Sequence, residues 1–188
     1  MEETPETKRH IEVKRGKPRF LEEVRTFTGA EKGSITHKVL GCVDYSLVKA
    51  GNLEKALNQL LEKGLVTQKE MSSIQKNHLI NFFSSDLGKR VLSSVRAERE
   101  WPFNMRISGG TLLQGVIDLC FLEQGEWILV DYKTDHLLPE DLLAHYSGQI
   151  NWYRTALEKI TNFKVREMFL FSLPLGKAIP VNKIDTEL

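Results

Sequence analysis

The spacing of apolar residues changes from a helical to an extended period near the middle of the chain. Between residues 31 and 94, apolar side chains recur three and four positions apart, which predicts amphipathic helices. In the segment GNLEKALNQLLEKG (51–64), we expect Asn52 to cap the start of a helix and Gly64 to end it in a left-handed conformation. The apolar stripe of this helix consists of Leu53, Ala56, Leu57, Leu60 and Leu61.

A second helix is predicted to begin at Thr67, because Glu70 lies three residues later and completes a capping box. Its buried face is expected to contain Met71, Ile74, Leu79 and Phe82. A shorter helical segment is predicted near residues 85–94. These segments make the N-terminal half of the chain helical.

After about residue 95 the pattern is typical of strands. We expect strands in RAEREWPF (96–103), GVIDLCFL (115–122) and WILVDYK (127–133), with EQGE (123–126) as a hairpin turn. PEDLLAHYSGQINWYRTALEKI returns to a helical pattern, with Pro139 in its first turn, and REMFLFSL (166–173) is expected to be the last strand. The pattern therefore predicts an α/β fold in which a helix packs on a largely buried sheet.

Composition and charge narrow the class of protein. The 188 residues are 41% hydrophobic, which suits one globular domain, and the net charge of +1 neither favours nor excludes DNA as a partner. Cys42 and Cys120 are expected to be reduced thiols in the core of a cytoplasmic protein. No stretch reaches the ~18 consecutive apolar residues of a membrane span.

Residues 1–20 differ from the rest of the chain, because they combine several basic residues with no apolar periodicity. We expect a basic arm or linker there, either a solvated tail or an arm that contacts DNA, followed by one domain over residues 21–188.

Charged residues interrupt the strand WILVDYK. Side chains alternate along a strand, so Asp131 and Lys133 point to one side and Tyr132 to the other. If GVIDLCFL pairs with this strand, Asp118 lies near Asp131. Two carboxylates and an ammonium at one place predict either a Mg²⁺ or Mn²⁺ site or a structural salt bridge between Asp131 and Lys133.

The motifs favour the first alternative. GVID followed by VDYKTD resembles the core of the PD-(D/E)XK nuclease superfamily, in which an acidic residue precedes a strand that carries D/E-x-K. GSITH (33–37), EWPF (100–103) and QINWY (149–153) occur around them in the order found in RecB-type nuclease domains. From about residue 20 onward, the chain resembles the C-terminal nuclease domain of AddA-type helicase/nuclease proteins.

This resemblance implies a restriction-endonuclease-like core, with a mixed central sheet flanked by helices, and it assigns roles to residues. His37, Asp118 and Asp131 would bind Mg²⁺, for which Mn²⁺ would substitute, together with the main-chain carbonyl of Tyr132. Lys133 would complete the catalytic set.

Glu100 resembles a further acidic residue of the family, although a surface glutamate at a strand edge is the alternative. Without the motif, the alternative interpretation of His37 is a structural histidine in the core. Gln149 and Tyr153 are four positions apart on one helix face, and the resemblance places them against the substrate; ordinary helix packing is the alternative.

Two features are missing from the sequence. No Gly-Lys pair has the glycine and hydroxyl residue of a P-loop, so the chain has no ATP site of that kind. Two cysteines are too few for the four thiolates of an iron-sulfur cluster, which favours the AddA kind over the AddB kind.

The expected function is hydrolysis of DNA, preferably single-stranded, by the exonuclease of a complex that processes double-strand breaks. The implied partners are DNA, helicase domains fused N-terminally and a second helicase-nuclease subunit. No association with a membrane is expected. The alternatives are a stand-alone RecB-like exonuclease and a catalytically inactive DNA-binding module with the nuclease fold.

Overall fold

The computed structural model describes residues 26–106, 110 and 112–184. The basic arm predicted for residues 1–20 lies outside them. The described N-terminal half is helical, as the sequence predicts. Its helices are α1 (Gly29–Cys42), α2 (Tyr45–Lys49), α3 (Leu53–Glu62), α4 (Gln68–Ser73), α5 (Lys76–Ser84) and α6 (Asp86–Ser93).

Side-chain caps define where several of these helices begin. Thr28 and Glu31 form a capping box at α1, and Thr67 and Glu70 form the predicted one at α4. Ser85 caps α6 by accepting a hydrogen bond from the backbone N–H of Gly88. Asn52 occupies the N-cap position of α3 as predicted, but its side chain makes no capping hydrogen bond.

A mixed sheet forms the second half. Its strands are β1 (Ala97–Arg106), β2 (Leu112–Glu123), β3 (Glu126–Lys133), β4 (Val165–Ser172) and β5 (Lys177–Pro180), in that spatial order. The helix α7 (Pro139–Thr161) connects β3 to β4, which is the parallel pair, whereas the other neighbours are antiparallel. Gln124 and Gly125 form the predicted hairpin turn, both with positive φ as such tight turns require.

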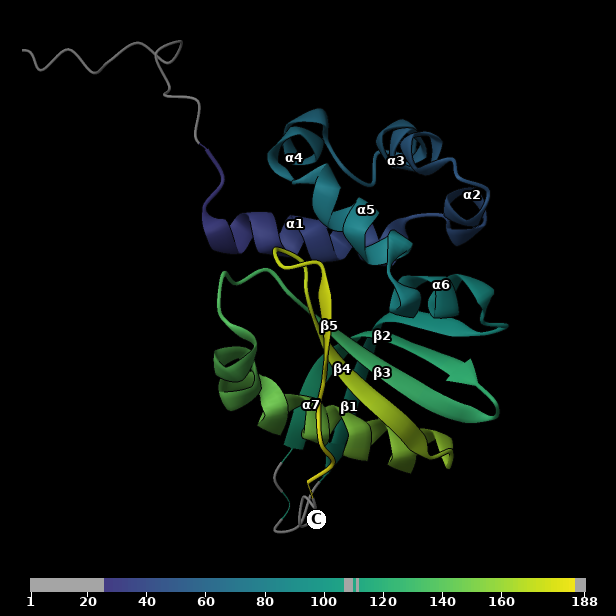
Figure 1. Cartoon of the computed structure of the whole chain (residues 1–188), viewed down its shortest axis with the longest axis vertical. Coiled ribbons are helices and arrows are strands. Elements are labelled where there is room, and N and C mark those ends of the chain that lie inside the picture. The colour runs from purple at the N-terminus through teal and green to yellow at the C-terminus, as the bar shows by residue number, and fades with distance from the viewer. Residues whose placement is uncertain (1–25, 107–109, 111, 185–188) are drawn as a thin grey trace, which may run out of the picture.

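The sheet separates two hydrophobic cores. Leu119 and Val130 belong to a core shared with α1 and the other N-terminal helices, and Leu129 belongs to a core shared with α7. Figure 1 shows these N-terminal helices on one side of the sheet and α7 on the other. This arrangement is the predicted helix-flanked mixed sheet, and its middle strand β3 is buried on both faces.

The structure corrects two predictions about the elements. The helix expected from Thr67 through Phe82 is divided, because Ile74 has an extended backbone that buries its side chain between α4 and α5. The Ser73 hydroxyl also donates to the Glu70 carbonyl, a local bond that competes with helix continuation. The strand at residues 166–173 is not the last one, because the four-residue β5 follows a turn at Gly176.

The cysteines are both free, but only one lies in the core. Cys120 on β2 is buried as predicted, whereas Cys42, the last residue of α1, is exposed. The prediction for Cys42 was wrong because the apolar neighbours Leu40 and Val43 lie on the buried side of the chain while Cys42 lies on the other. None of the described helices combines the length and the apolar character that crossing a membrane requires.

An ionic network joins α6 to the sheet. Arg90 on α6 forms ion pairs with Glu123 on β2, at 2.8 Å, and with Glu167 on β4, at 2.9 Å. Arg166 contacts the same two carboxylates. The Arg90 guanidinium also lies over the rings of Phe121 and Phe169. The same side chain therefore contacts both the ionic network and aromatic residues of the sheet.

We expect Glu123→Gln to lower the free energy of unfolding at pH 7 by about 1 kcal/mol, a value that allows for solvent screening at this partly exposed site. Hydrogen bonding to Arg90 lowers the pKa of Glu123 from its ordinary value of 4.5. The stabilisation is therefore present above pH 4.5 and is lost as the pH falls through the lower folded-state pKa.

Urea unfolding of both proteins from about pH 3 to pH 7 measures this difference. Glu62→Gln, on the exposed end of α3, is the control for replacing a glutamate by a glutamine and should leave the free energy of unfolding at pH 7 unchanged. A deficit of the Glu123 variant that stays constant down to pH 3 would contradict the ionic origin.

Candidate functional site

Asp118 lies where two strands of the sheet separate. The pairing of β2 with β3 begins at Leu119 and Val130, and residues before this pair on β2 leave β3. The Asp118 Oδ2 accepts a hydrogen bond of 2.8 Å from the backbone N–H of Tyr132, so a side chain replaces the missing strand contact. This bond fixes a buried carboxylate at the point where β2 and β3 part.

His37 approaches Asp118 from the helical half. It lies on α1, and its Nδ1 is 3.2 Å from Asp118 Oδ1. The edge of its ring contacts the Tyr132 ring, with centroids 5.9 Å apart. Tyr132 itself packs against Phe82 in the core, as expected for a side chain that faces away from Asp131 and Lys133. Tyr132 therefore positions Asp118 through its backbone and His37 through its ring.

Glu100 has an unusual backbone for its residue type. Its φ is +47°, in the left-handed region that non-glycine residues rarely adopt. The neighbouring pairs Arg99 with Leu119 and Trp101 with Ile117 place Glu100 opposite Asp118 on β2. A non-glycine residue in this conformation costs about 1–3 kcal/mol and is often found at a functional site.

Three side chains converge on one point. His37, Glu100 and Asp118 each offer a ligand atom, and these atoms all lie within 4.8 Å of one another. The residues come from α1, β1 and β2, so folding alone brings them together. Gly41 on α1 permits the approach, because a Cβ there would lie 2.5 Å from Cγ of Glu100.

Asp131 and Lys133 form the second part of the site. Both are buried on the side of β3 that faces α7, and Lys133 Nζ lies 2.7 Å from Asp131 Oδ2. That contact is a buried ion pair in which, among the described residues, the Lys133 ammonium is the partner of Asp131 Oδ2. The salt bridge considered from the sequence is present, and Asp131 does not belong to the group of three.

Residues of α7 hold the Lys133 ammonium from the other side. Lys133 Nζ donates to Gln149 Oε1 at 3.1 Å, and Gln149 Nε2 donates to the Tyr153 hydroxyl at 2.9 Å. The ammonium also lies 3.7 Å from the centroid of the Tyr146 ring. This chain of contacts gives the charged end of Lys133 one position in the site.

The charges perturb one another. Burial and then repulsion from Asp118 raise the pKa of both Glu100 and Asp131, and Lys133 opposes the increase at Asp131. Burial lowers the pKa of His37, but its contact with Asp118 and the nearby carboxylates outweigh burial, so the pKa is raised overall. The positive charges of the site therefore do not fully compensate the repulsion between its carboxylates.

The structure brings the side chains predicted from the motifs together around the point where β2 and β3 separate. His37, Glu100 and Asp118 form the group of three, whereas Asp131, Lys133, Gln149 and Tyr153 form the adjoining chain of contacts. A role for the Tyr132 carbonyl stays a prediction. Sequence reasoning missed Tyr146, although its spacing of three from Gln149 places both on one helix face.

Comparison with known proteins adds the family. Residues 12–183 match the family model described as the PD-(D/E)XK nuclease superfamily. The chain belongs to this superfamily. PD-(D/E)XK nucleases typically use divalent metals, and this domain carries a His/Glu/Asp cluster of the matching kind.

Relatives of this PD-(D/E)XK domain include much longer proteins. It is 31% identical to the A subunit of the ATP-dependent helicase/nuclease from Clostridium acetobutylicum over 88% of this chain, and 38% identical to its counterpart from Acetivibrio thermocellus over 82%. It spans only 15% and 14% of their lengths. The solved structure of SSO0001 covers 79% of this chain and 67% of its own, with a TM-score of 0.39 and 14% identity.

We expect Gly41→Ala to weaken the binding of Mn²⁺ about tenfold, because the new Cβ displaces Glu100 from His37 and Asp118. Alanine favours a helix over glycine by about 1 kcal/mol, which offsets part of the cost of moving Glu100, and thermal unfolding of both proteins checks that the variant is folded. Isothermal titration calorimetry measures the affinity.

Gly148→Ala on α7 is the matched control, because a Cβ at that position meets no atom within 4 Å. It should leave the affinity for Mn²⁺ unchanged. Equal affinities of the Gly41 variant and the parent would remove Glu100 from the metal ligands.

Proposed function

We propose that this domain hydrolyses phosphodiester bonds of DNA with the help of Mg²⁺, for which Mn²⁺ substitutes. The observation that carries the proposal is the convergence of His37, Glu100 and Asp118 beside the buried pair of Asp131 and Lys133. A phosphodiesterase needs cationic groups that stabilise the phosphate and a water that is activated at neutral pH.

The donor set suits a divalent cation. His37, Glu100 and Asp118 would hold it, with Asp131 beside them, because carboxylate oxygens are the ligands that Mg²⁺ and Mn²⁺ prefer. The buried Asp131 carboxylate supports the same conclusion, because burial and repulsion from Asp118 keep its pKa raised although the Lys133 ammonium lies 2.7 Å from Oδ2. A bound cation would stabilise charge on the phosphate and acidify a water molecule.

The residues of the chain have distinct tasks in this proposal. Lys133 donates from its ammonium to a phosphate oxygen and so stabilises the negative charge that grows during hydrolysis. Gln149 and Tyr146 position the ammonium, and Gln149 is in turn held by Tyr153. The Tyr132 carbonyl is proposed as an additional metal ligand.

The relatives suggest a larger setting. Their name describes a helicase and nuclease that depends on ATP. We propose that this domain is the exonuclease part of such a protein, that helicase domains precede it in the full chain, and that a second helicase-nuclease subunit works with it on broken DNA. A helicase delivers separated strands, so the proposed substrate is single-stranded DNA.

We expect Asp118→Asn and Lys133→Met each to reduce kcat on the order of 100- to 1,000-fold, because each removes a charge from the reacting centre. Both substitutions approximately keep the side-chain volume. Initial rates of hydrolysis of labelled DNA with Mg²⁺, and with a chelator as blank, measure the effect.

Asp86→Asn and Lys89→Met are the controls, since these residues form an exposed ion pair on α6. They should cleave DNA at the parent's rate. Full activity in folded Asp118 and Lys133 variants would disprove the assignment of the site.

We also expect the domain by itself to hydrolyse single-stranded DNA faster than duplex DNA. Its rate of hydrolysis should fall as the salt concentration rises and should not change when ATP is added. The net charge of +1 provides little general attraction for a duplex, and the sequence has no P-loop. Rates on matched single-stranded and duplex oligonucleotides, at two salt concentrations with and without ATP, check all three. A duplex preference or stimulation by ATP would show that the substrate or the setting is wrong.

A further inference from the structure

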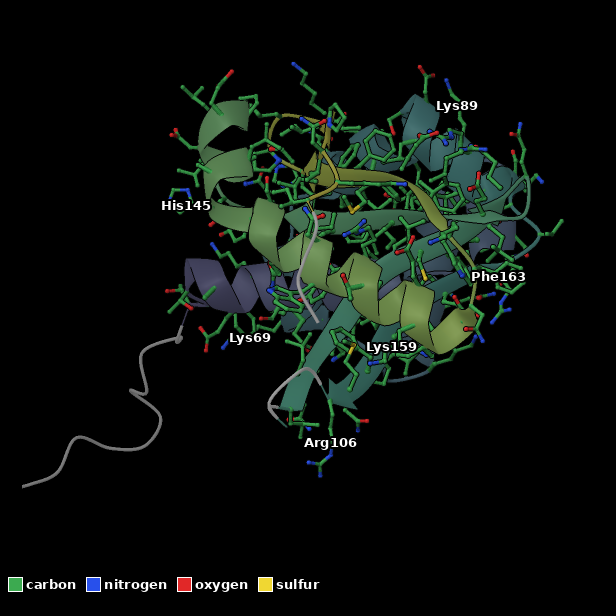
Figure 2. The ribbon with its side chains drawn as sticks, turned by 90° about the horizontal axis from the view of Figure 1, so that it is seen from below. Lys69, Lys89, Arg106, His145, Lys159 and Phe163 are labelled. Carbon is green, nitrogen blue, oxygen red and sulfur yellow. The ribbon has the colours of Figure 1, made fainter. Side chains whose placement is uncertain are left out.

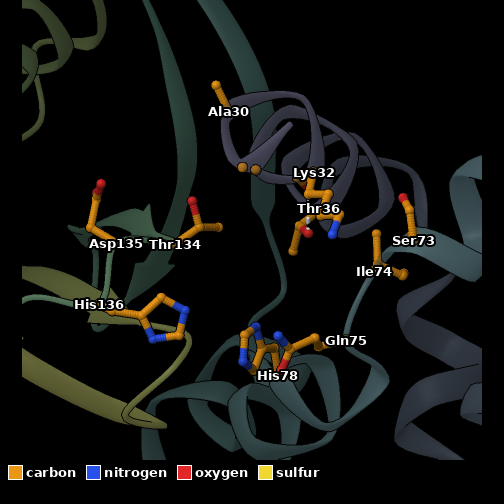
Figure 3. Close-up of a pocket in the computed structure, with 12 residues that line it drawn as sticks. Ala30, Lys32, Thr36, Ser73, Ile74, Gln75, His78, Thr134, Asp135 and His136 are labelled. Carbon is orange, nitrogen blue, oxygen red and sulfur yellow. Dashed lines mark hydrogen bonds between the residues drawn. The ribbon is translucent and has the colours of Figure 1, made fainter. Parts of the chain in front are cut away.

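A cavity of about 540 Å³ lies next to the candidate site, on the other side of α1 from Glu100. Its walls are the first half of α1, the junction between α4 and α5, and the residues that follow β3. None of the motif residues that form the candidate site contributes to it. Figure 3 shows Lys32 reaching into the space from α1, His78 and Gln75 on the opposite wall, and His136 at a third side.

The cavity continues towards the metal ligands. A second hollow of about 370 Å³ is lined by His37 and Glu100, and it shares Ala30, Gly33 and Thr134 with the first. At this boundary α1 and the segment after β3 approach closely, because a Cβ on Gly33 would lie 2.8 Å from Thr134 Oγ1. Gly33 and Thr134 therefore form a narrow contact that the cavity and the hollow at the site share as a wall.

The groups around the cavity favour an anion. Lys32 offers an ammonium, His78 and His136 offer imidazole nitrogens, and Gln75 adds a neutral amide. The only acidic residue in the described lining is Asp135, and its carboxylate already accepts a hydrogen bond of 3.0 Å from the Tyr146 hydroxyl. The described salt bridges include no partner for Lys32, His78 or His136.

The two histidines are close enough to affect each other. Burial and then repulsion from His136 lower the pKa of His78. An anion in the cavity would oppose this lowering of the His78 pKa, because a negative charge favours the protonated imidazole.

We propose that this cavity binds a phosphodiester group of the single DNA strand, next to the phosphate that is hydrolysed, through Lys32, His78 and His136. The inference rests on the proposed function, because it treats the adjoining site as the place of hydrolysis. The volume lies in the range of ~300–1,000 Å³ typical of small-ligand sites. A single strand can enter such a space, whereas a double helix is too wide.

In the proposed reaction, the cavity thus helps to determine which kind of DNA is bound. Lys32, His78 and His136 are proposed to contact phosphate and not base edges, so the cavity should bind DNA of any sequence. It should also contribute to the preference for single strands, because a separated strand can bend to place neighbouring phosphates in two adjoining hollows.

The test compares the parent chain with the double variant Lys32→Ala/His136→Gln. The matched control is Lys89→Ala/His145→Gln, which removes the same residue types from positions outside the cavity lining; Figure 2 shows both side chains at the surface, on α6 and α7. Fluorescence anisotropy with a labelled single strand of about 12 nucleotides, in a chelator, measures binding without hydrolysis.

We expect the cavity variant to bind this strand about tenfold more weakly than the parent and the control. The slope of log Kd against log salt should fall by about 0.7 for each phosphate that the variant no longer neutralises. In Mg²⁺, KM should rise by a similar factor while kcat changes less than about twofold. His78→Gln by itself should show a smaller change in the same direction.

Unchanged strand affinity and salt dependence in the folded cavity variant would overturn the inference. It would also be overturned if the variant bound the strand normally but lost inhibition by free thymidine monophosphate, since the cavity would then hold a released mononucleotide. A parent chain that binds the strand through these residues but never hydrolyses it would instead refute the proposed function and leave the cavity assignment intact.

Discussion

The hydrogen bond from the backbone N–H of Tyr132 to Asp118 Oδ2 is the contact on which the site depends. It forms where β2 leaves β3, so it satisfies a buried donor and fixes a buried carboxylate at once. The ring of the same Tyr132 packs in the core beneath His37. Because one residue supports two others from different elements, the positions of α1, β2 and β3 are coupled at the place where their polar side chains meet.

Burial of charge explains the remaining arrangement. Asp118 and Asp131 are both buried, and isolated buried carboxylates are costly unless cations or hydrogen bonds compensate. The structure compensates in two ways: Lys133 is held against Asp131 by residues of α7, while His37 contacts Asp118. These partners do not remove the repulsion, because the pKa of Asp131 is still raised. A divalent cation is the group that would complete the compensation, which links the stability of the site to its proposed chemistry.

The helical half contributes more than a cover for the sheet. It brings His37 from α1 to Asp118 and Glu100, and together with the segment after β3 it lines the cavity that includes His78 and His136. Gly41 and Gly33 on α1 make two close approaches possible, one to Glu100 and one to Thr134. In the proposed function, α1 therefore lines both the reacting centre and the cavity for the neighbouring phosphate.

The sequence by itself determined the elements and the local chemistry. Apolar periodicity predicted the helical half, the hairpin and α7, and strand alternation placed Asp131 and Lys133 on one side of β3, because these patterns depend on neighbours in sequence. The resemblance to nuclease motifs indicated His37, Asp118, Gln149 and Tyr153. Only the tertiary structure decided that Cys42 is exposed, that the backbone turns to a positive φ at Glu100, and that His37 meets Asp118 across 81 positions. Contacts of that kind depend on how strands separate and helices pack, and no local pattern of residues encodes them.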